Sequence, residues 1–157
     1  ILIFNVSAVS SEEGIYFLDV DYILNNTKTG KIIIEKLEKI NSNNITEIKI
    51  KEENLKKLEK EISTTKNVIS SDELNNKIKN FKNEIALYKS HKDKKNKEFK
   101  ELRDKELNIF FKEITPHIED FMEINSIKII LDKKNIFIAN SNYDITEKLI
   151  EYINTKY

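Results

Sequence analysis

The sequence predicts an α+β protein in which a long antiparallel α-helical hairpin joins a small β-containing body, and three observations carry this prediction. Two glycines and one proline in 157 residues leave little punctuation for turns, so very long helices can form. Apolar residues over 31–105 recur in steps of three and four, the spacing of a coiled-coil seam. Stretches at 15–24 and 127–139 are instead rich in β-branched and aromatic residues, as strands are.

Residues 1–10, ILIFNVSAVS, precede the first predicted strand. They run from apolar to small side chains ahead of an acidic pair, as the end of a secretory signal peptide does. A frayed N-terminal strand is the alternative interpretation. We expect residues 1–10 to be a signal-peptide remnant.

The predicted body combines residues 15–30 with residues 106–157. IYFLDVDYIL, residues 15–24, predicts one half-buried strand because acidic residues alternate with apolar ones, and the polar run that ends at Gly30 interrupts it. After residue 106 the apolar stripe widens, which suits a helix packed in a body rather than in a two-helix seam.

The last part of the chain predicts a β-hairpin and a closing helix. Strands are expected at 127–132 and 136–139, with a Lys-Lys-Asn turn between them. Asp144 precedes the final helix, and Glu147 follows three residues later, a relative of the capping box.

Residues 31–105 predict the helical hairpin, an arm with its tip near residues 63–72. Ser70 or Ser71 is a plausible N-cap for the returning helix because acidic residues follow in its first turn. The expected seam of the first helix is Ile34, Leu37, Asn41, Asn44, Ile48, Lys51, Leu55, Leu58 and Ile62. That of the second helix is Leu74, Ile78, Phe81, Ile85, Tyr88, Lys92, Lys95, Phe99 and Leu102.

Both seams lose their apolar residues at the same height when the hairpin is folded about its tip. In that register Asn44 faces Lys92 and Asn41 faces Lys95. A polar waist gives up apolar burial worth about 1.5 to 3 kcal/mol for each large side chain. We therefore predict that the hairpin flexes at these four residues. His91, one position from the seam, is interpreted as a solvated surface residue.

The composition argues against an enzyme. The chain has no cysteine, two histidines far apart in the sequence and only two glycines, so it offers no thiolate chemistry and no glycine-rich phosphate loop. We expect no catalytic residues, no metal site and no cofactor. Residues 75–105 hold 11 basic and 5 acidic residues, a net charge of 11 − 5 = +6. Acidic residues are interleaved there and no aromatic platform accompanies the lysines, so no nucleic acid is expected as a partner.

The order of elements resembles the Skp (OmpH-like) family of periplasmic chaperones. The similarity rests on a strand ending in DVDYIL, TGKIIIEKLEKI at the start of a long helix, a restart at SSDEL, the stretch IKIILDKKNIFIA and the closing DITEKLIEYIN. It implies a homotrimer whose strands assemble a β-barrel, with three helical tentacles around a cavity. It also implies an ATP-independent holdase that binds unfolded outer-membrane proteins in the periplasm and prevents their aggregation during delivery to the outer membrane.

The resemblance turns the basic helix and the isoleucines off the seam into candidate client-binding residues, where a client is an unfolded protein held by the chaperone. The lysines would attract the client or an anionic lipid or lipopolysaccharide surface, although the isoleucines could instead face a neighbouring subunit. The candidates are Lys77, Lys79, Lys82, Lys89, Lys92, Lys94, Lys95, Lys97, Tyr88, Ile33, Ile40, Ile45, Ile50 and Ile69.

Two other functions remain open from the residues. A structural or adaptor coiled coil would dock its hairpin on one fixed partner. A cytosolic hairpin chaperone resembling prefoldin would have a similar outline and no cleavable signal.

Overall fold

The computed structural model describes residues 14–157, so the predicted signal-peptide remnant at 1–10 lies outside the described residues. The described chain divides into two compact units. We call residues 14–32 with Ile109–Tyr157 the body unit, and Ile33–Asn108 the hairpin unit. Two long helices, α2 (Lys28–Thr65) and α3 (Ser71–Ile124), contribute residues to both units.

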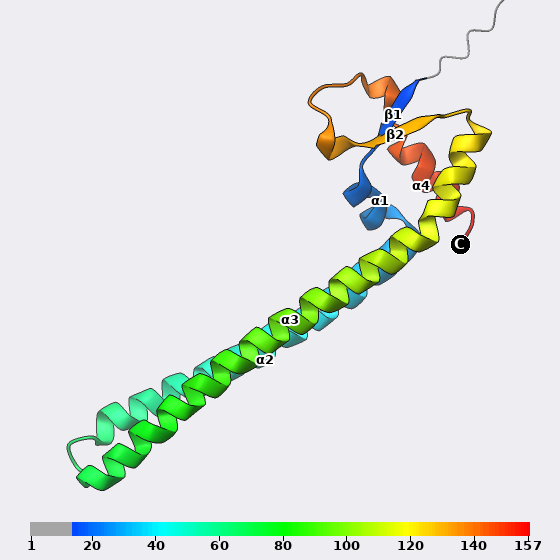
Figure 1. The fold of residues 1–157 in the computed structure, drawn as a ribbon. Helices are drawn as coiled ribbons and strands as arrows, with labels where there is room; N and C mark the ends of the chain where they lie inside the picture. Colours follow the sequence, from blue (N-terminus) through cyan, green and yellow to red (C-terminus); the bar gives the residue numbers. More distant parts are fainter. Residues whose placement is uncertain (1–13) are drawn as a thin grey trace, which may run out of the picture. The chain divides into compact units, whose positions relative to one another are not determined.

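The body unit is built on two short parallel strands. β1 (Ile15–Leu18) pairs with β2 (Ile129–Asp132), and Ile15 lies opposite Ile129. Two short helices, α1 (Val20–Asn26) and α4 (Thr146–Asn154), contact each other beside them (Figure 1). The core of the body unit contains five apolar side chains that are at most 1% exposed, namely Ile23, Phe110, Ile114, Leu149 and Ile153.

The predicted strand at 15–24 is wrong beyond Leu18. The chain turns at Asp19, whose Oδ1 accepts a hydrogen bond from the backbone N–H of Tyr22 at 2.9 Å, and α1 begins at the next residue. The acidic residue that suggested strand alternation is therefore a helix N-cap. Helical geometry then brings the adjacent residues Ile23 and Leu24 into the core, where a strand would have directed them to opposite faces.

The predicted C-terminal β-hairpin is also wrong. The Lys-Lys-Asn turn is a short 3₁₀ helix, η1 (Lys133–Asn135), and residues 136–139 form no strand. The side chains of Phe137 and Ile138 are 102% and 84% exposed. A strand needs a neighbour for its backbone hydrogen bonds, and β2 takes β1 as its neighbour. Alternating apolar residues at 136–139 predicted a strand, but these residues have no strand partner within the described chain.

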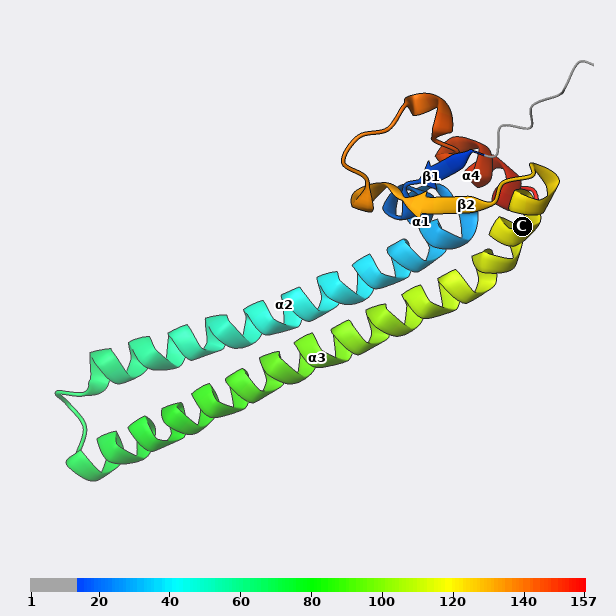
Figure 2. The same cartoon turned by 45° about the horizontal axis from the view of Figure 1, so that its top comes forward.

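The hairpin unit consists of antiparallel stretches of α2 and α3 joined by a five-residue loop, Lys66–Ser70, and both views show the two helices alongside each other (Figure 2). The Oγ of Ser70 accepts a hydrogen bond from the backbone N–H of Glu73 at 3.3 Å, which confirms Ser70 as the N-cap. Ion pairs join the helices along their length, from Lys36 with Glu106 at 2.7 Å to Lys77 with Glu61. Within residues 14–157, no helix is both long enough and apolar enough to cross a bilayer.

Candidate functional site

The polar waist of the hairpin is organised by Glu47. Its Oε1 lies 2.9 Å from the Nε2 of His91 and its Oε2 lies 2.8 Å from the Nζ of Lys95. The Nε2 of His91 is shielded from solvent and makes no well-aligned hydrogen bond, so its approach to Glu47 is a charge contact that forms when the imidazole is protonated. One carboxylate on α2 therefore links two basic side chains on α3.

The register of the waist differs from the predicted one. Asn44 and Lys95 are half-buried between the helices as expected, but Asn41 and Lys92 are exposed. The α3 seam steps from Tyr88 to a half-buried His91, three residues on, so Lys92 rotates outward. The interpretation of His91 as a solvated residue is wrong, because only 25% of its side chain is exposed.

Glu47 and Lys95 each shift the pKa of the other. A hydrogen bond from Lys95, opposed by partial desolvation and aided by the nearby charges of Lys95 and His91, lowers the pKa of the Glu47 carboxyl below its ordinary value. The same hydrogen bond raises the pKa of the Lys95 ammonium. Both groups therefore keep their charges over a wider pH range than isolated side chains would.

The candidate lysines fall into two sets. Lys77 and Lys95 are paired across the hairpin with Glu61 and Glu47, and Lys94 and Lys97 lie 3.8 Å from the acidic residue four positions on. The second set is exposed and has no carboxylate oxygen within 4 Å among residues 14–157. It comprises Lys79, Lys82, Lys89 and Lys92.

The candidate apolar residues differ in exposure. Ile33 is 8% exposed and belongs to the core, whereas Ile45 and Ile50 are 57% and 54% exposed. Three further candidates are half-buried, namely Ile40, Ile69 and Tyr88. A hollow of about 490 Å³ brings Ile45 together with Lys92, although the sequence places them on different helices. The structure thus joins one predicted apolar residue to one predicted basic residue.

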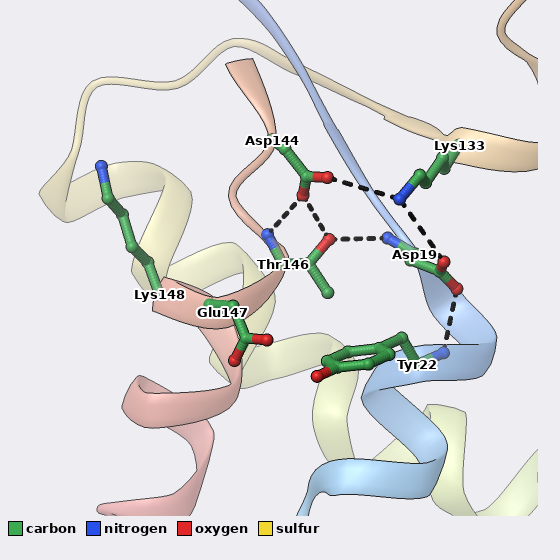
Figure 3. Close-up of a pocket in the computed structure, with 7 residues that line it drawn as sticks. All are labelled: Asp19, Tyr22, Lys133, Asp144, Thr146, Glu147 and Lys148. Atoms are coloured by element: carbon green, nitrogen blue, oxygen red, sulfur yellow. Dashed lines mark hydrogen bonds and ion pairs between the residues drawn. The ribbon is translucent and has the colours of Figure 1, made fainter. Parts of the chain in front are cut away.

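A second polar cluster lies in the body unit (Figure 3). The Nζ of Lys133 lies 3.8 Å from Asp19 Oδ2 and 3.6 Å from Asp144 Oδ2. The Oγ1 of Thr146 accepts a hydrogen bond from the backbone N–H of Asp19 at 2.9 Å. These contacts tie the start of α1, the end of β2 and the start of α4 together. They had no signal in the sequence because the three segments are far apart along the chain.

The predicted cap of the last helix is partly confirmed. The Oδ1 of Asp144 accepts a hydrogen bond from the first N–H of α4, that of Thr146, at 3.0 Å. Burial acts to raise the pKa of the Asp144 carboxyl, but hydrogen bonds from Thr146 and the ammonium of Lys133 outweigh it and lower that pKa. Glu147 makes no hydrogen bond to the start of α4; its carboxylate instead raises the pKa of the Tyr22 phenol, which is favoured in its neutral form beside that negative charge. No group of three potential metal-ligating side chains is found among residues 14–157.

The sequence of this chain matches a known protein family. The model of a family described as outer membrane protein (OmpH-like) matches residues 14–153. The chain belongs to the OmpH-like family. This membership, the long helical hairpin and the small strand pair confirm the fold class predicted from the sequence.

A solved structure shares the OmpH-like fold. It is that of a protein from Caulobacter crescentus CB15 assigned to the OmpH-like outer membrane chaperones. The two structures superpose with a TM-score of 0.77 at 17% sequence identity, and the match covers 99% of this chain and 92% of the other. No curated protein sequence matches this chain significantly.

Proposed function

We propose that this OmpH-like protein is an ATP-independent chaperone that binds unfolded outer-membrane proteins in the periplasm and prevents their aggregation. The observation that carries the proposal is the family membership, together with a hairpin surface on which exposed isoleucines and lysines occur together. The name of the Caulobacter protein, an outer membrane chaperone, supports the same role.

The hairpin surface suits weak, unspecific contact. Ile45 and Ile50 offer isolated apolar side chains, and Lys79, Lys82 and Lys89 offer ammonium groups that no carboxylate within residues 14–157 pairs. Exposed charge pairs are worth only about 0.2 to 1 kcal/mol each and are screened at physiological salt. A client is therefore held by many small contacts, and its affinity falls as salt increases. The same lysines would contact an anionic lipid or lipopolysaccharide surface.

The active assembly in this proposal is a homotrimer in which the body units pair into a β-barrel. The body unit exposes apolar side chains on a strand edge and on the segment after it, with Ile129, Leu131 and Phe137 at 48%, 42% and 102% exposure. Unpaired strand edges with apolar side chains are relieved when copies pair around an axis. Residues 136–139 are the segment that would gain a strand partner in such an assembly.

The hairpin flexes at the polar waist in this proposal, although the residues that form the waist differ from the predicted ones. Glu47, His91 and Lys95 replace apolar side chains in the seam, so the helices are held there by charge contacts rather than by packing. We expect the two stretches of hairpin on either side of this waist to move as separate segments, which would adapt the arms to clients of different size.

The test is suppression of aggregation. An unfolded outer-membrane β-barrel protein is diluted from urea into buffer with and without the purified chain, and light scattering is followed. Strong suppression without ATP, with native mass spectra of three chains and one client, is the expected result. A monomer that leaves scattering unchanged would refute both the holdase and the trimer. Tight binding to a single folded partner would favour an adaptor instead.

A further inference from the structure

A groove crosses the hairpin unit between the waist and the tip. It consists of two adjoining hollows of about 590 and 180 Å³ that share Leu58, Glu84 and Leu87. Leu87 is 63% exposed and Leu58 is 38% exposed. Within residues 71–108, Leu87 is the one large apolar side chain that α3 leaves exposed. The combined volume of the two hollows lies in the range of about 300 to 1,000 Å³ that ligand pockets in proteins occupy.

The charges on this face of the hairpin follow a seven-residue repeat with one missing pair. Positions 47, 54 and 61 of α2 face positions 91, 84 and 77 of α3. The outer two positions hold contacts between an acidic and a basic side chain, the ion pair of Glu61 with Lys77 at 2.5 Å and the approach of Glu47 to His91 at 2.9 Å. The middle position pairs Asn54 with Glu84, and both line the smaller hollow.

The carboxylate of Glu84 therefore lacks a counter-ion. No basic nitrogen lies within 4 Å of it among residues 14–157. Lys51 also lines the smaller hollow, but its ammonium does not reach Glu84 within that distance. The negative charge of Glu84 thus lies beside two exposed leucines, on a helix whose residues 75–105 carry a net charge of 11 − 5 = +6.

We propose that this groove binds an extended polypeptide segment in which a lysine or arginine is flanked by apolar residues. The inference rests on the proposed chaperone function and names the kind of client segment that this part of the arm holds. Charge complementarity to Glu84 selects the basic residue, and Leu58 and Leu87 contact its apolar neighbours. None of the residues predicted from the sequence as client-binding, apart from Lys77 and Tyr88, lines this groove.

The dimensions of the groove suit an extended chain. From Lys51 to Ile62, which line its two ends, α2 rises about 16 Å at 1.5 Å per residue. An extended chain advances about 3.3 Å per residue, so about five residues fit, with alternate side chains on the groove side. The amides of Asn54, Asn80 and Asn83 line the groove and can donate to and accept from the peptide groups of such a segment.

The experiment measures the binding of labelled seven-residue peptides to the full chain by fluorescence anisotropy. The probe is Ser-Leu-Ser-Arg-Ser-Leu-Ser, compared with versions whose central residue is Gln or Glu. The test variants are Glu84→Lys and Leu87→Ser. The matched controls are Glu59→Lys and Val68→Ser, which change an exposed acidic residue and an 81% exposed apolar residue outside the groove.

The wild-type chain is expected to bind the Arg peptide about threefold more tightly than the Glu peptide, the scale of one exposed ion pair. Glu84→Lys reverses that order, Leu87→Ser weakens both peptides about threefold, and the controls leave both affinities unchanged. Equal affinity for all three peptides, or equal effects of test and control variants, would overturn the proposal. So would a lower oligomeric state of Leu87→Ser, which assigns the groove to a second copy, or saturable binding of a neutral detergent without peptide binding, which assigns it to an acyl chain.

The light-scattering assay separates this inference from the proposed function. A wild-type chain that suppresses aggregation but does not discriminate between the peptides remains a chaperone, and the groove proposal fails. A chain that discriminates between the peptides but does not suppress aggregation keeps the groove and loses the holdase role.

Discussion

The body unit and the hairpin unit are each stabilised by a different kind of interaction. Among residues 14–157, every side chain that is less than 2% exposed belongs to the body unit, whereas Ile33 and Leu37 are the only buried apolar side chains of the hairpin unit. The rest of the hairpin seam is half-buried and is supplemented by ion pairs between the helices. Packing thus specifies the body, and helix formation with many weak contacts specifies the hairpin. The hairpin can therefore yield locally where the body cannot.

The largest expected effect is a cavity in the body core. Leu149→Ala removes most of a fully buried side chain and should lower the free energy of unfolding by about 2 to 5 kcal/mol. Denaturant titration followed by circular dichroism measures the loss. Leu55→Ala, at a half-buried position in the hairpin seam, is the matched variant and should cost clearly less. Equal losses would break the contrast between the two units.

A second large effect is expected at Gly30, in the first turns of α2. A Cβ there would collide with the backbone carbonyl of Leu24. Gly30→Ala should therefore lower the free energy of unfolding by about 1 to 3 kcal/mol, as overpacking of a tight site does. Gly14→Ala is the control, because its Cβ would meet only the rings of Tyr16 and Tyr143, at 3.1 and 3.2 Å, and these can shift. A neutral Gly30→Ala would show that α1 moves easily against α2.

A smaller and local effect is expected at the waist. Glu47→Gln removes the charge that holds His91 and Lys95 to α2. Hydrogen exchange should become faster for amides on both helices near the waist, while amides of α4 in the body unit stay protected. Glu59→Gln is the control at an exposed position without an ion pair in the described chain. Faster exchange throughout the protein would mean that the waist supports the whole fold.

The smallest effect is the pH dependence of the waist. Because the pKa of Glu47 is lowered in the folded chain, its contribution to stability is fully present above the ordinary value of 4.5 and is lost as the pH falls through the folded value. Amide exchange near the waist should therefore accelerate, relative to the rest of α2, below about pH 4.5. The Glu47→Gln variant should not show this acceleration. The same pH dependence of amide exchange near the waist in the wild-type chain and in Glu47→Gln would show that Glu47 does not organise the waist.

Local sequence signals predicted the helices well and the strands poorly. Steps of three and four residues persist over dozens of positions in the hairpin, so a single ambiguous residue does not disturb the assignment. The strands span four residues each, and at that length one acidic residue such as Asp19 reads equally as a strand position or as a helix cap. Residues 136–139 illustrate the same limit, since strand-forming side chains there do not supply a pairing partner.

The candidate site was predicted only in outline. The polar gap in both seams was visible in the sequence, but the register that buries His91 instead of Lys92 depends on how the two helices rotate about each other. The repeat of Glu47, Asn54 and Glu61 against His91, Glu84 and Lys77 has a seven-residue spacing that is visible in the sequence. Which of these positions face each other depends on the register of the two helices, and polar residues beside the seam do not fix that register.

The amino-acid sequence by itself determined the α+β class, the long hairpin, the turn capped by Ser70 and the basic character of the returning helix. These features depend on periodicity, capping and composition, which are local. Only the tertiary structure decided the parallel pairing of β1 with β2, the cluster of Asp19, Lys133 and Thr146, and the groove around Glu84. The reason is physical, because each of these joins segments that are distant along the chain, and their contacts depend on packing that no single stretch of sequence encodes.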